Sequence, residues 1–300
     1  RIPQQNLIQL QNLRSFGSGT RGVLLFAIPC GCQGGEAMGL HDFTFYDLIN
    51  RNAVCFNNRP AWLEVDDQRS LTFAEVKQQV DRLAAGLQQA GINKGDRIGV
   101  LGKNSLEYFL LYGAAAALGA IILPINWRLS AEEAIFNLND GAPRLLFVDA
   151  EYQTMIHGVK SRLPSVKRYF NLKPPGGQFD DFSTLSPISP GFQPGQIGDA
   201  DGLVIIHTAA VAGRPRGALL SHRNFISANV QLNLLMHLSP SDVHLNLLPL
   251  FHVGGLFMAT MSFHAGALNV NMSKFDAAQA VELIAEKKVT VLFDFSPILG

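Results

Sequence analysis

The chain has 300 residues, of which 47% are hydrophobic, 9% aromatic and 16% charged, so it can fill a large apolar core and is not intrinsically disordered. Its 24 basic and 24 acidic side chains cancel, and no basic excess indicates nucleic-acid binding. Three cysteines are too few for a disulfide scaffold, and no run approaches the ~18 apolar residues of a transmembrane helix. We therefore expect a cytoplasmic, ligand-binding protein with no nucleic-acid partner and no transmembrane segment.

Residues 1–37 precede the first methionine, Met38, and we expect them to form a non-native or disordered leader. The apolar run at 23–28 is shorter than the core of a secretory signal and lacks a small-residue cleavage site. Positions 17–22 read G-S-G-T-R-G, which matches G-x-G-x-x-G in form. A dinucleotide-binding fingerprint follows a strand, however, and no strand pattern precedes these glycines, so no nucleotide site is predicted here.

From position 71 onward, patterns typical of helices and strands alternate along the chain. Short apolar runs predict strands at 97–101, 120–124, 145–148, 203–207, 267–271 and 289–293. Capping residues predict helices that begin after Thr72, Ser105, Ser130, Ser221 and Asp276. Alternation of this kind implies right-handed crossovers and largely parallel strands. The predicted fold class is therefore α/β, with mostly parallel sheets flanked by helices in two packed subdomains.

Between positions 173 and 198 the composition changes to Pro, Gly, Ser and Gln, which is typical of a linker-like connection at the surface. We therefore expect a first α/β subdomain at 38–172 and a second at 199–300. The second carries the candidate nucleotide loop. No helix pattern follows the strand at 289–293, so we expect this subdomain to be truncated.

The turn after the strand at 203–207 is the strongest candidate for phosphate binding, because parallel sheets bind ligands at the carboxyl ends of their strands. It runs from Thr208 to Gly217 and reads T-A-A-V-A-G-R-P-R-G. Small residues let successive backbone N–H groups approach an oxyanion, and Arg214 or Arg216 can add charge-assisted hydrogen bonds. The G-x-x-x-x-G-K-[ST] phosphate loop is absent. A plain surface turn with solvated arginines is the alternative.

Four motifs in order along 42–300 resemble the acyl-adenylate-forming superfamily, which includes acyl-CoA synthetases, luciferases and peptide-synthetase adenylation domains. They are L-T-F-A-E at 71–75, the G-A…P-I-N…S-A-E-E segment at 119–133, H-T-A-A-V-A-G-R-P-R-G at 207–217 and L-P-L-F-H at 248–252. The third resembles the family's T-S-G-T-T-G-x-P-K-G loop. The resemblance implies ATP-dependent activation of a carboxylic acid to acyl-AMP and transfer to coenzyme A, with ATP, Mg²⁺ and coenzyme A as cofactors.

Within this family a fatty acid is the expected substrate. An amino-acid-activating domain would carry an Asp that pairs with the substrate's α-amino group, and none occurs at 248–258. An aryl-acid CoA ligase is the alternative.

By this resemblance, the phosphates of ATP lie against Thr208, Ala209, Ala210, Val211, Ala212, Gly213, Arg216 and Gly217. Several of these positions depart from the family's loop. Alanine or valine replaces its Ser and both Thr, alanine replaces its central Gly, and arginine replaces its Lys. A hydrogen bond to a charged group contributes roughly 1.5–3 kcal/mol. The loop is therefore expected either to work in a variant form or to belong to a non-catalytic, degenerate synthetase that binds ligand without turnover.

The resemblance also places His252 in the acyl or aryl pocket near the reacting carboxylate, where Gly254 and Gly255 would leave room for an acyl chain. A hydrogen-bonded core histidine beside Phe251 is the alternative.

Three other side chains are expected to have no part in the chemistry. His207 replaces a frequent family Tyr and should pack, and His222 should lie on the surface in the first turn of its helix. Cys55 should be a small buried hydrophobe.

The family's later motifs, including its metal-binding Glu and catalytic Lys, would follow position 300. The resemblance therefore implies no catalytic residue and no metal ligand in this fragment, which we expect to be inactive alone. Expected partners are the small-molecule acid, ATP and coenzyme A, while peripheral membrane contact and a homodimer stay open.

Overall fold

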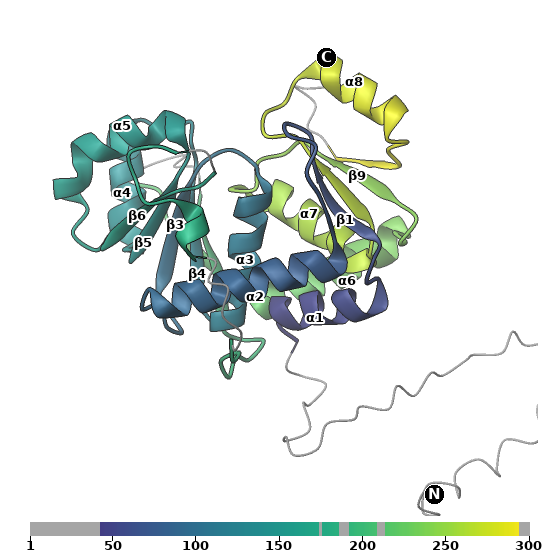
Figure 1. Ribbon diagram of the computed structural model, residues 1–300, viewed down its shortest axis with the longest axis horizontal. Coiled ribbons are helices and arrows are strands. Elements are labelled where there is room, and N and C mark those ends of the chain that lie inside the picture. Colours follow the sequence, from purple (N-terminus) through teal and green to yellow (C-terminus); the bar gives the residue numbers. More distant parts are fainter. Residues whose placement is uncertain (1–42, 174–175, 186–191, 209–213, 294–300) are drawn as a thin grey trace, which may run out of the picture. The chain divides into compact units, whose positions relative to one another are not determined.

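The computed structural model describes residues 43–173, 176–185, 192–208 and 214–293 (Figure 1). The expected leader at 1–37 and the loop positions Ala209, Ala210, Val211, Ala212 and Gly213 lie outside the described residues. The described α-helices are α1 (Phe45–Cys55), α2 (Phe73–Gln89), α3 (Leu106–Leu118), α4 (Ala131–Gly141), α5 (Ala150–Val159), α6 (His222–Met236), α7 (Val253–Ala265) and α8 (Ala277–Glu286). None of them combines the length and apolar character needed to cross a membrane.

A six-stranded sheet contains the strands that flank the candidate loop. Its order is β6 (Arg168–Asn171), β5 (Leu145–Val148), β3 (Arg97–Leu101), β4 (Ile121–Ile125), β7 (Gly202–His207) and β8 (Gly217–Ser221). All neighbours are parallel except β7 and β8, which form an antiparallel pair. Successive side chains face opposite sides of the sheet. Ile122 therefore packs in the cluster that includes α3, and Leu123 in the cluster with α4 and α5.

A five-stranded sheet contains the remaining described strands. Its order is β11 (Val291–Leu292), β9 (Val243–Asn246), β10 (Leu268–Asn271), β1 (Pro60–Glu64) and β2 (Ser70–Thr72), and only the β1–β2 pair is antiparallel. Leu283 of α8 belongs to one apolar cluster with Leu245 of β9 and Val270 of β10, and α7 contacts the same two strands. Figure 1 shows α7 and α8 beside β9. Each sheet draws strands from both sides of the 173–198 connection, since β7 and β8 join one sheet and β1 and β2 the other.

One apolar cluster joins the two sheets. Trp62 of β1 stacks on Phe109 of α3 with ring centroids 4.5 Å apart, and Phe109 contacts Phe263 of α7 at 5.3 Å. The same cluster includes Ile122 of β4. Buried aromatic contacts of this kind stabilise the arrangement of the two sheets through apolar area and ring geometry.

The helix starts expected from the sequence are confirmed. Thr72 with Glu75 and Ser130 with Glu133 form capping boxes, in which each side chain bonds the other's backbone N–H. The N-caps of the other three are Ser105 for α3, Ser221 for α6 and Asp276 for α8. Local capping chemistry therefore decides where these helices begin.

Several elements have no counterpart among the expected ones: α1, α5, α7, β1, β2, β6, β8 and β9. Helix α7 is buried almost all round, so it lacks the amphipathic stripe by which a surface helix is identified. Strand β8 lies at the sheet edge with Leu219 exposed, and its five residues carry no alternation. The strand that ends at His207 is therefore followed by an antiparallel partner strand, β8, before the helix that begins after Ser221.

Candidate ligand-binding site

A cavity of about 550 Å³ lies where the carboxyl ends of strands from both sheets meet. Its lining comes from Asn104 after β3, residues 126–128 after β4, residues 247–249 and 251–252 after β9, and residues 273–275 after β10. This is the edge at which parallel sheets bind ligands. The walls are largely apolar, and the charged side chains among the lining residues are Arg128 and Lys274.

A second cavity of about 790 Å³ includes the stem of the candidate loop. His207, Thr208 and Arg214 line it together with residues of α4 and the start of α7. The apolar part of the lining comprises Pro124, Leu129, Phe136, Ile206, Pro215, Phe251 and Val253. Both volumes lie in the usual range for small-molecule sites.

The two cavities share the side chains of Asn126, Phe251 and His252. Phe251 packs edge-on against Trp127 with ring centroids 6.5 Å apart. His252 is the N-cap of α7, and its Nδ1 accepts a hydrogen bond of 3.1 Å from the Gly254 N–H. In the neutral ring this bond places the proton on Nε2, which makes that nitrogen a hydrogen-bond donor.

Asn104 holds the segment that carries His252. Its Oδ1 accepts a hydrogen bond of 2.7 Å from the Leu250 N–H, and its Nδ2 donates to the Leu248 carbonyl at 2.9 Å and the Met272 carbonyl at 3.3 Å. Tyr112 adds a bond of 3.0 Å to the Leu250 carbonyl. The sequence reasoning missed Asn104; its signal is a polar residue between a buried strand and the N-cap Ser105.

The described part of the candidate loop is the base of the β7–β8 hairpin. Thr208 N–H donates to the Arg216 carbonyl at 3.0 Å, and the Thr208 hydroxyl approaches the same oxygen at 3.4 Å. A Cβ at Gly217 would lie 2.8 Å from Ile205 Cγ2, so glycine is required by close packing. The Arg214 guanidinium lies 5.7 Å from the centre of the Phe136 ring.

Gly254 and Gly255 lie in the first turn of α7 rather than in an open loop. A Cβ at Gly255 would approach the Pro249 carbonyl oxygen to 2.3 Å and the Leu248 oxygen to 2.6 Å. This glycine therefore lets the helix pack directly on the preceding backbone, and the space beside it is filled. Contact of either glycine with an acyl chain stays a prediction.

Of the three side chains expected to have no part in the chemistry, His207 packs as expected, whereas His222 and Cys55 differ from expectation. His222 is buried rather than at the surface; its Nδ1 accepts a bond of 3.1 Å from the Phe45 N–H, and burial lowers the pKa of its imidazole to about 4. His207 packs and also bonds Asp140 at 2.9 Å. Cys55 is exposed, because it falls in the last turn of α1. Each difference depends on contacts between distant segments or on the end of a helix that the sequence reasoning did not find.

Among the described residues, no three His, Cys, Asp or Glu side chains gather in a group able to hold a metal ion. Two acidic residues, Glu132 and Glu133 on α4, are among the described residues that line the loop's cavity. Each carboxylate already has a partner within the protein: Glu133 completes the capping box with Ser130, and Glu132 forms an ion pair with Arg162 at 2.6 Å.

Residues 49–299 match the protein family described as AMP-binding enzyme. The chain is 31% identical to a fatty acid–[acyl-carrier-protein] ligase of Streptomyces coeruleorubidus, over 74% of this chain and 42% of that protein. It is 34% identical to an indoleacetate–CoA ligase of Aromatoleum aromaticum, over 75% and 44% respectively. A crystal structure of a Rhodopseudomonas palustris protein assigned as a long-chain-fatty-acid CoA ligase superposes with a TM-score of 0.82 at 42% identity, covering 87% of this chain and 65% of that one. The chain thus spans less than half the length of the two curated relatives.

Proposed function

The chain belongs to the AMP-binding enzyme family, and from this premise we propose that it serves ATP-dependent activation of a carboxylic acid. A carboxylate oxygen of the acid attacks the α-phosphorus of ATP, the bond to pyrophosphate breaks, and acyl-AMP forms. A thiol then attacks the acyl carbon, and AMP leaves as the acyl thioester forms. Coenzyme A is the proposed thiol, and the protein is proposed to act in the cytoplasm.

The observation that carries this proposal is the wall shared by the two cavities. Asn126, Phe251 and His252 line both the cavity that contains the loop stem and a second cavity with apolar walls and the cations Arg128 and Lys274. In the first step the carboxylate oxygen must reach the α-phosphorus of ATP, and in the second the thiol must reach the acyl carbon. The reacting carboxyl group therefore needs one approach for ATP and a second for the thiol. His252 lies where these approaches would meet, with Nε2 as a donor toward a carboxylate or carbonyl oxygen.

The phosphates of ATP are proposed to lie against the loop from Thr208 to Gly217, including the positions 209–213 predicted from the sequence. Arg214 and Arg216 supply positive charge beside the hairpin base, and positioning together with charge neutralisation would provide the catalysis. ATP would bring Mg²⁺ on its phosphates. The described residues do not form a metal-binding group, so we assign no protein ligand to this ion and derive no step through it.

A fatty acid is the proposed substrate, with an aryl acid as the alternative. The aliphatic and aromatic side chains of the 790 Å³ cavity suit either acid, and the relatives include a fatty-acid ligase and an indoleacetate ligase. A degenerate protein that binds ligand without turnover is the third reading, because the loop lacks three of the family's hydroxyl groups.

The chain spans less than half the length of its curated relatives, and we propose that turnover requires the part of their length that it does not match. We further propose peripheral membrane contact and a homodimer.

The test is carboxylate-dependent exchange between ATP and pyrophosphate, measured across fatty, aryl and amino acids. Two proteins are assayed side by side: a longer protein that contains this chain and matches the full length of its relatives, and the 300-residue chain by itself. Exchange with fatty acids in the longer protein alone is the expected result. Exchange with aryl acids only would change the assigned substrate to an aryl acid. If the folded protein shows no exchange with any acid, the proposal is overturned in favour of a degenerate protein that binds ligand without turnover.

A further inference from the structure

A carboxylate and an imidazole meet at the base of the candidate loop. His207 ends β7, and its Nε2 donates a hydrogen bond of 2.9 Å to Asp140 Oδ2 in the last turn of α4. The His207 side chain is only 4% exposed, whereas that of Asp140 is 49% exposed. The bond therefore joins a buried strand end to the rim of a neighbouring helix.

Asp140 is poorly placed for its own helix. A carboxylate near the C-terminus of a helix faces the negative end of the helix dipole, and α4 has no basic residue in its last turn. A donor from β7 offsets this repulsion. Gly217 leaves room for it, because a Cβ there would lie 3.3 Å from His207 Nε2 and 3.4 Å from Asp140 Oδ2. Helix α4 and strands β7 and β8 therefore meet at the hydrogen bond between His207 and Asp140.

This bond is adjacent to the closure of the loop. His207 is paired with Gly217 across the hairpin, and the next residue, Thr208, donates its N–H to the Arg216 carbonyl at 3.0 Å. His207 Nδ1 is buried and has no hydrogen-bond partner among the described residues. Within the described part of the chain, Asp140 is therefore the hydrogen-bond partner of the imidazole, and no second partner fixes the ring.

We propose that Asp140 and His207 form a positioning pair, which holds Thr208 and Arg216 in the geometry that receives the phosphates of ATP. The inference rests on the proposed function. The loop sequence carries Ala and Val where the family has Ser and Thr, so it has fewer side-chain hydrogen bonds of its own. A fixed stem compensates, because a loop that is ordered before binding loses less entropy when the ligand arrives.

The test combines ATP affinity with amide hydrogen exchange at Thr208, both measured on the 300-residue chain. Asp140→Ala removes the acceptor, and Asp140→Asn keeps a neutral one. Asp180→Ala is the matched control, since Asp180 is 52% exposed and pairs with Arg168 at 2.8 Å on the distant edge strand β6. His207→Gln places an N–H donor near the Nε2 position, whereas His207→Asn does not.

We expect Asp140→Ala to weaken ATP binding about tenfold and to speed exchange of the Thr208 amide by a similar factor, as the loss of one hydrogen bond to a charged group predicts. Asp140→Asn and His207→Gln should retain most of the wild-type affinity, and Asp180→Ala all of it. A purely electrostatic role for Asp140 predicts the opposite sign, because removing an anion strengthens polyphosphate binding. If the wild-type chain binds ATP and Asp140→Ala binds it equally well or more tightly, the positioning role of the pair is overturned, while the proposed function stands. If the wild-type chain does not bind ATP, the result counts against the proposed function. In that case, an unchanged exchange rate of the Thr208 amide in Asp140→Ala would also overturn the inference that the pair orders the base of the hairpin.

Discussion

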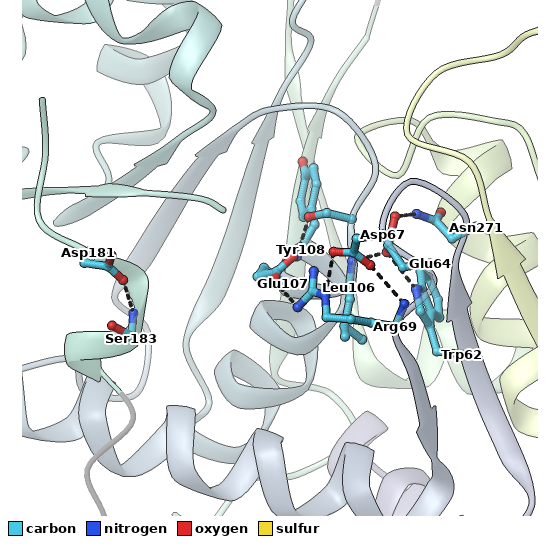
Figure 2. Close-up of polar contacts among 11 residues, drawn as sticks. Trp62, Glu64, Asp67, Arg69, Leu106, Glu107, Tyr108, Asp181, Ser183 and Asn271 are labelled. Carbon is cyan, nitrogen blue, oxygen red and sulfur yellow. Dashed lines mark hydrogen bonds and ion pairs between the residues drawn. The ribbon is translucent and has the colours of Figure 1, made fainter. Parts of the chain in front are cut away.

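The Glu64 carboxylate accepts a hydrogen bond of 2.8 Å from the Asn271 side-chain amide, although 207 positions separate the two residues (Figure 2). Its other oxygen accepts bonds from Trp62 Nε1 at 3.2 Å and from the Leu106 N–H at 2.7 Å. One buried carboxylate therefore ties β1 and β10 to the start of α3. Burial raises the pKa of Glu64 to about 7, against the opposing effect of these hydrogen bonds.

Stability is expected to fall as pH rises through neutrality because of Glu64. Its pKa is about 7 in the folded protein against a reference value of 4.5, so between these values the folded state retains a proton that the unfolded state has released. The contribution is fully present below pH 4.5 and is lost as pH rises through 7. At about 1.36 kcal/mol per pKa unit it amounts to roughly 3 kcal/mol. Urea unfolding at pH 5 and 8 should show a smaller loss for Glu64→Gln than for wild type, and equal losses would contradict this origin.

His222 is expected to act in the opposite direction. Burial lowers its pKa to about 4 from a reference value of 6.5, so the unfolded chain binds the proton first and stability falls on acidification from 6.5 to 4. His222→Asn keeps an acceptor for the Phe45 N–H but cannot be protonated in this range. We predict that this variant loses roughly 3 kcal/mol less than wild type over that interval, measured by urea unfolding. His157, exposed on α5, supplies the control variant His157→Asn; if both variants behave alike, burial is not the cause.

Gly255→Ala should destabilise the protein by about 1–3 kcal/mol, because its methyl group would collide with the Pro249 and Leu248 carbonyl oxygens. The displaced helix start would also move His252, so affinity for the acid substrate should fall with stability. Gly158→Ala is the matched control, since nothing lies within 4 Å of a Cβ there. In a helix this control should gain about 0.5–1 kcal/mol. Thermal unfolding distinguishes the two, and a neutral Gly255→Ala would show that the contact relaxes freely.

Arg216 is expected to contribute charge to ATP binding. Arg216→Ala should weaken ATP binding roughly tenfold, while Arg216→Lys, which restores the family's residue, should stay within a few-fold of wild type. Calorimetric titration with ATP measures both. Arg168→Ala removes an exposed arginine on the distant strand β6 and should leave the affinity unchanged. Equal losses for Arg216→Ala and Arg168→Ala would mean that net charge, not position, controls binding.

The α/β class, the helix starts and the candidate binding segments could be predicted from the sequence. Thr72 with Glu75 and Ser130 with Glu133 act through side chains three positions apart, so their caps are visible in any local stretch of sequence. The loop from Thr208 and the segment ending at His252 were found because their order along the chain matched a family. Helix α7 was not predicted, because burial on nearly every side removes the periodic pattern that marks a surface helix.

The tertiary structure alone decided what those segments touch. Asn104 meets Leu250, Asp140 meets His207 and Glu64 meets Asn271 across 146, 67 and 207 positions, and no local pattern specifies such pairs. Burial, which sets the pKa of Glu64 and of His222, is likewise a property of how the two sheets pack. Hydrogen bonds that cap a helix depend on residues within one turn, whereas desolvation and long-range pairing depend on the whole fold; the sequence determined the first kind and the packed chain the second.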